Sequence, residues 1–243
     1  WRKSLKMRET KTSFQQDLRN LDMQILVVSA TEMEIAPFMK AFPEQEVLIT
    51  GVGAPSALFQ LCRRFSQADY QFVIQAGIAG SFKQETPFGM VVAVARDCFA
   101  DLGIVENKRI IDLVTAGLAT ANDGMVCAGW IDNPSAANRE LGIACVDAVT
   151  VNLTGDTPIL SGMIQDKYHP DIESMEGAAF HFACHEFKQP YLQLRAISNH
   201  VGERDKSKWR IKEAITNLNN ELVRIMAQLK KGNALNEVYN DHD

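Results

Sequence analysis

Short, nearly continuous apolar runs are separated by amphipathic segments along most of this chain. Runs at 24–28, 72–77, 90–95 and 191–198 are apolar without a regular alternation of apolar and polar positions. Such runs are typical of strands that are covered on both faces. The pattern therefore predicts buried strands at these four places. Further strand-like segments lie at 47–50 and 143–153.

Helices are predicted between these strands and after the last one. Thr31 is a suitable N-cap for a helix over 32–42, and Pro55 opens a helix that ends near Phe65. Residues 177–188 also favour a helix, and apolar residues three and four apart predict a long amphipathic helix from Ile211 to Leu229. Strands that alternate with helices predict an α/β fold, a single domain with a central mixed β-sheet flanked by helices.

Both ends of the chain differ in composition from the part between them. Residues 1–22 are polar and mixed in charge, and they contain no apolar core of a secretion signal. We interpret them as a poorly ordered extension. Residues 23–231 form the predicted domain, and residues 232–243 form a polar tail.

Composition narrows the class of protein. Of the 243 residues, 46% are hydrophobic and 23% are charged, which is typical of a globular domain, and the net charge is -5. An acidic chain without a basic stripe argues against nucleic-acid binding. Its apolar runs are far shorter than the ~20 residues that cross a membrane. The five cysteines are odd in number and contain no CxxC spacing, so we expect no disulfide framework, no metal site and a cytoplasmic location.

Polar groups follow several of the predicted strands. In open α/β sheets, ligands bind beyond the carboxyl ends of the strands. Glu32 and Glu34 follow the first strand, a small-residue segment at 77–81 follows the third, and Asn199 ends the last one. Glu176 precedes a helix. Each also has an ordinary structural explanation, as a helix-dipole partner, a turn, an Asx turn or a cap.

Taken in order, six segments resemble the nucleoside phosphorylase and nucleosidase superfamily. Within it, the chain is most similar to the futalosine hydrolases of menaquinone biosynthesis and also resembles the methylthioadenosine nucleosidases. The latter carry Asp where Asn199 stands and a histidine where Ala100 stands, which disfavours a methylthio substrate. The segments are ATEMEIAPF, GVGAPSA, QAGIAGSF, TGDTPIL, SMEGAAFHFAC and LRAISN.

The resemblance implies a role for each matching residue. Glu34 corresponds to the base that activates water, and Glu32 points about 200° away from it on a helix. Glu176 corresponds to the acceptor for the ribose hydroxyls, and the backbone of Ile159 to the group that reads the far edge of the purine. The other implied substrate-binding residues are Val52, Gly77, Ile78, Ala79, Met175, Ser198 and Trp209.

An amide at position 199 predicts which base is released. The Asn199 oxygen can accept from a protonated N7, while its nitrogen donates to O6 of a 6-oxopurine such as hypoxanthine. An aspartate can only accept, which suits the N6 donor of adenine. Leaving one such buried group unpaired costs ~1–3 kcal/mol. We therefore expect a 6-oxopurine and assign catalysis to Glu34 and Asn199.

Other functions of the same fold stay open at this stage. They are an aminofutalosine or methylthioadenosine nucleosidase, a purine nucleoside phosphorylase, and a non-catalytic nucleoside-binding protein. Carboxylates near the nucleophile site suit water better than phosphate, so hydrolysis is favoured. Arg195 lies in an apolar strand and needs a buried partner. Arg204, Lys206 and Lys208 are candidates for a carboxylate on the 5′ side. The resemblance implies a homodimer, and nothing indicates a cofactor.

Overall fold

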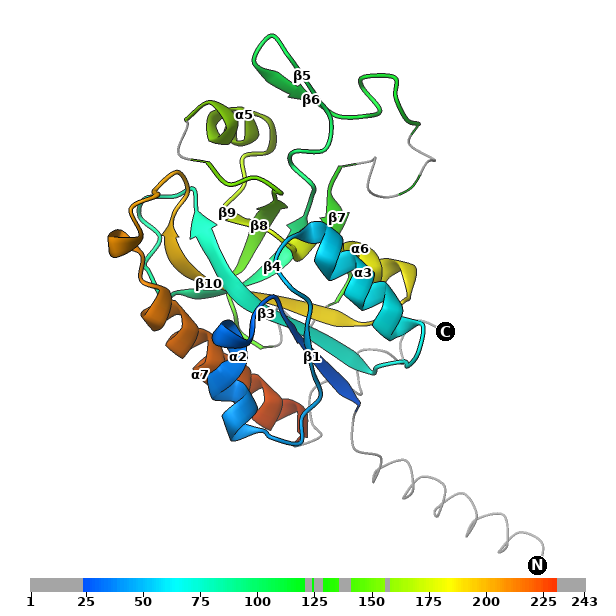
Figure 1. Cartoon of the computed structure of the whole chain (residues 1–243), viewed down its shortest axis with the longest axis vertical. Coiled ribbons are helices and arrows are strands. Elements are labelled where there is room, and N and C mark those ends of the chain that lie inside the picture. The colour runs from blue at the N-terminus through cyan, green and yellow to red at the C-terminus, as the bar shows by residue number, and fades with distance from the viewer. Residues whose placement is uncertain (1–23, 121–123, 125–128, 136–140, 156–157, 231–243) are drawn as a thin grey trace, which may run out of the picture.

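The computed structural model describes residues 24–120, 124, 129–135, 141–155 and 158–230. Among them, one eight-stranded sheet carries helices on both faces, which confirms the predicted α/β fold (Figure 1). The proposed extension at 1–22 and tail at 232–243 lie outside the described residues. The strands are β1 (Ile25–Ser29), β2 (Val47–Ile49), β3 (Phe72–Ser81), β4 (Val91–Asp97), β5 (Ile104–Glu106), β6 (Arg109–Ile111), β7 (Ile131–Asp132), β8 (Cys145–Thr150), β9 (Ile172–Ser174) and β10 (Tyr191–His200). The helices are α2 (Glu32–Ala41), α3 (Ala54–Phe65), α5 (Pro158–Tyr168), α6 (Gly177–Glu186), the short 3₁₀ helix η2 (Lys206–Lys208) and α7 (Ile211–Lys230).

The sheet is mixed and partly closed on itself. Its path runs β10-β4-β8-β9-β3-β1-β2, and β10 also pairs with β3. Strands β3, β10, β4, β8 and β9 therefore form a ring, from which β1 and β2 extend beside β3. β1, β2, β3 and β10 are parallel, whereas β4 runs antiparallel to β10 and β9 runs antiparallel to β3. Ring closure gives β3 a partner strand on each side at its carboxyl end, β10 on one and β9 on the other.

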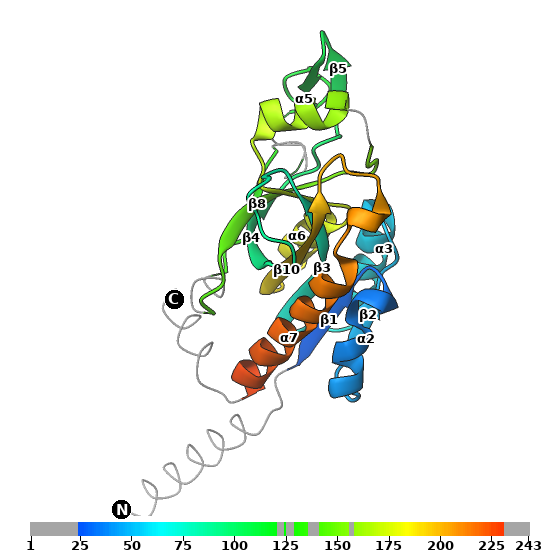
Figure 2. The same ribbon diagram turned by 90° about the vertical axis from the view of Figure 1, so that its left-hand side faces the viewer.

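Two apolar layers hold the helices on opposite faces of the sheet. Along β1, Ile25 and Val27 pack into one cluster with α2 and α7, while Leu26 and Val28 pack into a second cluster with α3 and α6. Figure 2 shows α7 and α2 together on one side of the strands, and α5 with the β5–β6 hairpin at one end of the molecule. Burial on both faces explains why these strands carry no alternation of apolar and polar residues.

The predicted elements are confirmed, but several strands are longer than predicted. β3 continues to Ser81 and β10 continues to His200, because their backbones still pair beyond the polar residues through a register shift between Ile197 and Asn199. The polar residues Ser198 and Asn199 are therefore part of the last paired stretch of β10 and do not follow the strand. The short elements β5, β6, β7, β9 and α5 carry no pattern strong enough to predict.

The structure also bears on the remaining sequence predictions. Cys62, Cys98, Cys145 and Cys184 are free. Among the described residues, no helix is long and apolar enough to cross a bilayer. Over the same part of the chain, no three His, Cys, Asp or Glu side chains gather in a way that would hold a metal ion.

Candidate active site

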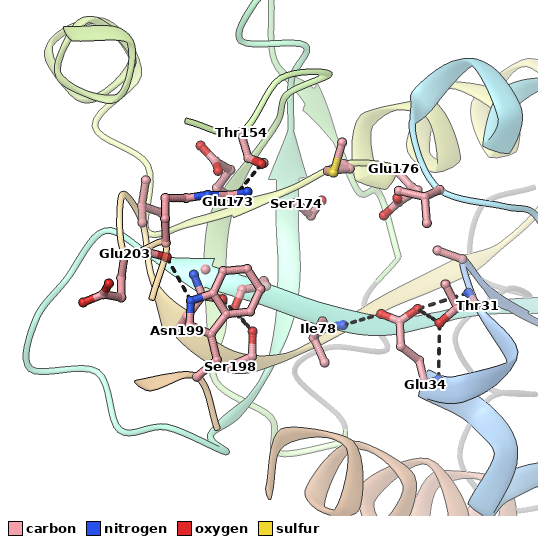
Figure 3. Close-up of a pocket in the computed structure, with 18 of the residues that line it drawn as sticks. Thr31, Glu34, Ile78, Thr154, Glu173, Ser174, Glu176, Ser198, Asn199 and Glu203 are labelled. Carbon is pink, nitrogen blue, oxygen red and sulfur yellow. Dashed lines mark hydrogen bonds between the residues drawn. The ribbon is translucent and has the colours of Figure 1, made fainter. Parts of the chain in front are cut away.

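A cavity of about 250 Å³ opens at the carboxyl ends of β1, β3 and β10. Figure 3 shows Glu34 and Glu176 at one end of it and Asn199 and Glu173 at the other. Nine of the eleven predicted site residues line the cavity. They are Glu34, Val52, Ile78, Ala79, Met175, Glu176, Ser198, Asn199 and Trp209.

Glu34 is held in place by its own helix start and by β3. Thr31 caps α2, and the Glu34 carboxylate completes the capping box by accepting from the Thr31 N–H at 3.1 Å and from its hydroxyl at 2.8 Å. The other carboxylate oxygen accepts from the Ile78 N–H at 3.0 Å. Glu34 is buried, whereas Glu32 is exposed, as the helical spacing predicted.

Glu176 stands at the N-cap position of α6, but its side chain makes no cap hydrogen bond. One carboxylate oxygen accepts from the Gly53 N–H at 2.9 Å, and the other lies 3.7 Å from Nη1 of Arg195. Gly53 can offer its N–H there because it adopts a φ of 95°, which favours glycine. The carboxylate is therefore aimed at the cavity and not used to cap the helix.

Arg195 has the buried partners that the sequence required. Its guanidinium is almost fully buried, donates to Gln75 at 3.0 Å and pairs with Glu176. A Cβ at Gly77 would lie 2.4 Å from Nη1 of Arg195 and 3.3 Å from the Glu34 carboxylate. Both charged groups therefore approach the same point of β3, and only glycine leaves room for them.

The small-residue segment at 77–81 was expected to bind substrate, and the structure gives it a further role. Gly77 does not line the cavity, and the Ile78 N–H is taken by Glu34, so neither backbone group is directed at a ligand. The segment instead lets the carboxylate and the guanidinium come close to the strand. Ile78 and Ala79 do line the cavity.

Behind Glu176 lies a buried polar layer. Asp97 accepts from the Thr150 hydroxyl at 2.9 Å and from the Gln193 amide at 3.2 Å. Burial raises the pKa of the Asp97 carboxyl to about 7, and the hydrogen bond from Thr150 partly offsets the rise. Burial also lowers the pKa of His181 to about 3. At neutral pH His181 is therefore uncharged, as its hydrogen bond with the Ile131 carbonyl at 3.1 Å allows.

At the other end of the cavity, Asn199 is oriented by its neighbours. Its amide oxygen accepts from the Ser198 hydroxyl at 2.7 Å, and its amide nitrogen donates to the His200 carbonyl at 2.9 Å. An amide nitrogen carries two hydrogens and its oxygen two lone pairs, so one donor and one acceptor position stay available. Gly80 lies in register with Asn199 on β10 and with Glu173 on β9.

The loop after β10 forms a wall of the cavity. Trp209 donates its indole N–H to the Glu203 carbonyl at 2.9 Å, and Arg204 donates to the Thr154 hydroxyl at 3.0 Å. Of the three cations proposed for the 5′ side, Arg204 lines the cavity. Lys208 instead pairs with the Glu203 carboxylate at 2.7 Å.

Ile159 is placed differently from the expectation. It lies in the first turn of α5, its side chain is 67% exposed, and it does not line the cavity, where Thr154 and Gly155 stand instead. The reason is that α5 begins at Pro158 and carries Ile159 outward. A contact between its backbone and a purine stays a prediction. Ala100 is fully buried and is also absent from the cavity wall.

Glu173 is a cavity residue that the sequence did not single out. Burial, followed by the nearby charge of Asp101, raises the pKa of its carboxyl to about 7, and Arg204 partly offsets this rise. Its place three residues before Glu176 is the signal that could have found it. Its strand, β9, has only three residues and is too short to show a pattern of apolar and polar positions.

Comparison with known proteins decides the family. Residues 43–230 match the phosphorylase superfamily. The chain belongs to that superfamily. Two further members are similar over nearly their whole length. Futalosine hydrolase from Thermus thermophilus is 29% identical over 218 residues, which cover 84% of this chain and 95% of the relative. Futalosine hydrolase from Streptomyces coelicolor is 28% identical, covering 81% of this chain and 92% of the relative.

Two solved structures share the fold. Native futalosine hydrolase of Helicobacter pylori matches with a TM-score of 0.72 at 14% identity, over 86% of this chain and 99% of the other. The 5'-methylthioadenosine/S-adenosylhomocysteine nucleosidase of the same organism matches with a TM-score of 0.70 at 15% identity, over 86% and 100%. The fold alone therefore does not separate the two activities.

Proposed function

We propose that this protein hydrolyses the N-ribosidic bond of futalosine and releases hypoxanthine and dehypoxanthine futalosine, a step of menaquinone biosynthesis. The observation that carries the proposal is the cavity with two carboxylates, Glu34 and Glu176, at one end and the amide of Asn199 at the other. The two futalosine hydrolases that align with more than four-fifths of the chain support the choice of substrate.

The chemistry divides between the two ends of the cavity. Glu34 takes a proton from a water molecule, and the water oxygen bonds to C1′ as the bond from C1′ to N9 breaks. The electron pair of that bond stays on the purine, which takes up a proton from solvent at N7. The sugar passes through a cationic, oxocarbenium-like state, as in glycoside hydrolysis. Glu176 accepts from the ribose hydroxyls and favours this cation.

Neighbouring groups hold the Glu176 carboxylate in the orientation that this task requires. The Gly53 N–H and the Arg195 guanidinium contact its two carboxylate oxygens. Charge-assisted contacts of this kind are stronger than neutral ones. Because one partner is a backbone N–H and the other a buried guanidinium, the hydroxyl-binding carboxylate does not need to reorganise when the sugar becomes cationic.

The purine end supports a 6-oxopurine. Asn199 has one N–H and one lone pair left after its contacts to His200 and Ser198. These match O6 and a protonated N7 of hypoxanthine. The 5′ side of the nucleoside is proposed to meet Val52, Trp209 and Arg204, since the aryl group of futalosine can stack on an indole and its carboxylate can pair with a guanidinium.

Water is favoured over phosphate as the nucleophile. Among the described residues that line the cavity, Glu34, Glu173, Glu176 and Glu203 are carboxylates, and Arg204 is the one lysine or arginine. A phosphate dianion would face this negative charge without enough positive donors.

We further propose a cytoplasmic homodimer. An apolar groove near α3, lined by Leu58, Phe99 and Leu102 among others, supports a protein contact there.

An assay for released base tests the proposal. The protein is incubated with futalosine, inosine and methylthioadenosine, each with and without phosphate. Hypoxanthine released from futalosine at a rate independent of phosphate is the expected result. Adenine as the main product would refute the base assignment, phosphate-dependent release would indicate a phosphorylase, and binding without release would indicate a non-catalytic protein.

Glu34→Gln tests the assignment of the base. The variant should lose turnover by several orders of magnitude because an amide cannot take the proton from water. Substrate binding should persist, since Gln keeps the size of the side chain. Near-normal kcat in this variant would show that Glu34 is not the base.

A further inference from the structure

Asn219 is a buried polar residue that does not line the cavity. It lies in the middle of α7, is 3% exposed, and faces α2. Its amide nitrogen donates to the Glu34 carbonyl at 2.8 Å and to the Ile215 carbonyl at 2.7 Å. Its amide oxygen accepts from the Phe38 N–H at 2.9 Å. Every hydrogen of this amide therefore has a partner.

The two α2 groups that Asn219 contacts are the pair that an α-helix joins to each other. The Glu34 carbonyl and the Phe38 N–H are four residues apart, the spacing of the helical hydrogen bond. Pro37 stands directly before Phe38 inside the helix. A proline there has no N–H to donate to the Met33 carbonyl four residues earlier, and its ring crowds that carbonyl. Asn219 binds the next pair along the helix, Glu34 and Phe38, and therefore supports the turn of α2 that the proline weakens.

That turn carries the catalytic carboxylate. The side chain of Glu34 is fixed by Thr31 and Ile78, which contact its two oxygens. Its backbone is fixed by Asn219, which contacts its carbonyl. The apolar packing of Ile35 and Phe38 against α7 holds the helix as a whole. The contact from Asn219 adds a directional restraint at the backbone of Glu34 itself.

We propose that Asn219 is a positioning residue for the base Glu34, acting through the backbone of α2. The inference rests on the proposed function of Glu34. A displacement of about 1 Å at a catalytic group, caused by a change outside the site, can lower the rate about a hundredfold. Asn219→Ala should therefore lower kcat by about 10-fold to 100-fold and change KM by less than about threefold.

A matched control lies two residues earlier on the same helix. Asn217 also uses its amide to bridge α7 to another segment, donating to the Gly89 carbonyl at 2.9 Å. Asn217→Ala removes one tertiary hydrogen bond of α7 that does not reach α2, whereas Asn219→Ala removes two that do. The Asn217→Ala variant should lose some thermal stability and keep kcat within about twofold of the wild-type value.

The experiment measures kcat and KM for futalosine, the Kd for hypoxanthine and the Tm in both alanine variants. It also measures the residual rate of Glu34→Gln with and without Asn219→Ala. A residue that acts only by placing Glu34 should cost nothing further once the carboxylate is gone. The hypoxanthine Kd should be unchanged in all variants. Asn219→Ser, which adds no buried charge and keeps a group that can donate and accept, gives the same kinetic comparison if the alanine variant does not fold.

Two results would overturn the inference. One is a kcat loss in Asn219→Ala no larger than that in Asn217→Ala. The other is an equal fold-loss from Asn219→Ala in the wild-type and Glu34→Gln backgrounds, which would mean a general structural role. A Glu34→Gln variant with wild-type activity would instead refute the proposed function itself, so the two failures are distinguishable.

Discussion

Replacing Asn199 by Asp exchanges one atom of the side chain and should reverse the preference for the base. In the wild-type protein the amide nitrogen donates to the His200 carbonyl at 2.9 Å, and the amide oxygen accepts from the Ser198 hydroxyl at 2.7 Å. In Asn199→Asp, a carboxylate oxygen would face the His200 carbonyl, and no donor would be left for O6 of a 6-oxopurine.

The size of the effect follows from the unpaired groups. An unsatisfied acceptor in a buried site costs ~1–3 kcal/mol. The clash with His200 is common to every substrate and cancels in a ratio of substrates. The group at C6 does not cancel, because the carboxylate repels O6 but accepts from the N6 amine. The ratio of kcat/KM for futalosine over aminofutalosine should therefore fall by about 10-fold to 100-fold.

The assay quantifies hypoxanthine and adenine by chromatography after incubation with each substrate over a range of concentrations. Both substrates carry the same 5′ group, so contacts to Trp209 and Arg204 do not enter the comparison. Thermal unfolding checks that the variant is folded. A ratio that stays within about twofold of the wild-type value would refute the reading of Asn199 as the group that distinguishes O6 from N6.

The remaining predictions concern the 5′ side of the substrate and the response of stability to pH. Arg204→Met should raise the KM for futalosine about fivefold, whereas Lys208→Met, which removes a cation outside the cavity wall, should leave KM unchanged. Equal KM values in the two variants would contradict a carboxylate contact by Arg204. The native protein keeps a proton on Asp97, whose pKa is raised to about 7, so this group loses its stabilising effect as pH rises from about 4 to about 7. His181, whose pKa is lowered to about 3 from 6.5, acts oppositely, since the unfolded chain gains a proton as pH falls through 6.5. The free energy of unfolding, measured in urea at pH 4.5 and 6.5, should therefore rise with pH in Asp97→Asn relative to wild type. In His181→Gln it should fall with pH relative to wild type. The same pH dependence in all three proteins would contradict the opposing effects of the two groups.

Much of the site could be predicted because its groups follow strong local patterns. Thr31 marks the start of the helix, and Glu32 and Glu34 are two residues apart on it. Helical geometry therefore predicts that only one of the two carboxylates faces inward. Asn199 was visible because polar residues interrupt a buried strand. The mixed sheet follows from apolar strands that alternate with helices.

Other features depend on contacts between distant parts of the chain, for which one sequence holds no signal. Asn219 lies 185 residues from Glu34, and nothing in the amphipathic pattern of α7 distinguishes it from other polar positions. The sequence indicates that Arg195 needs a buried partner, but only the folded structure identifies that partner as Glu176. The outward direction of the Ile159 side chain depends on where α5 begins, and the sequence marks that start only by Pro158.

Strand β3 sets the distance between the two halves of the proposed chemistry. The Ile78 N–H holds the Glu34 carboxylate, and Gly80, two residues further along the same strand, lies in register with Asn199. A strand rises about 3.3 Å per residue, so about 6.6 Å of one rigid element separates the anchor of the water-activating group from the anchor of the base-reading group. Loops can change length and sequence around this site without altering that interval. The residues proposed to recognise the 5′ group lie on such loops. Recognition of that group can therefore diverge while the geometry of cleavage is inherited unchanged.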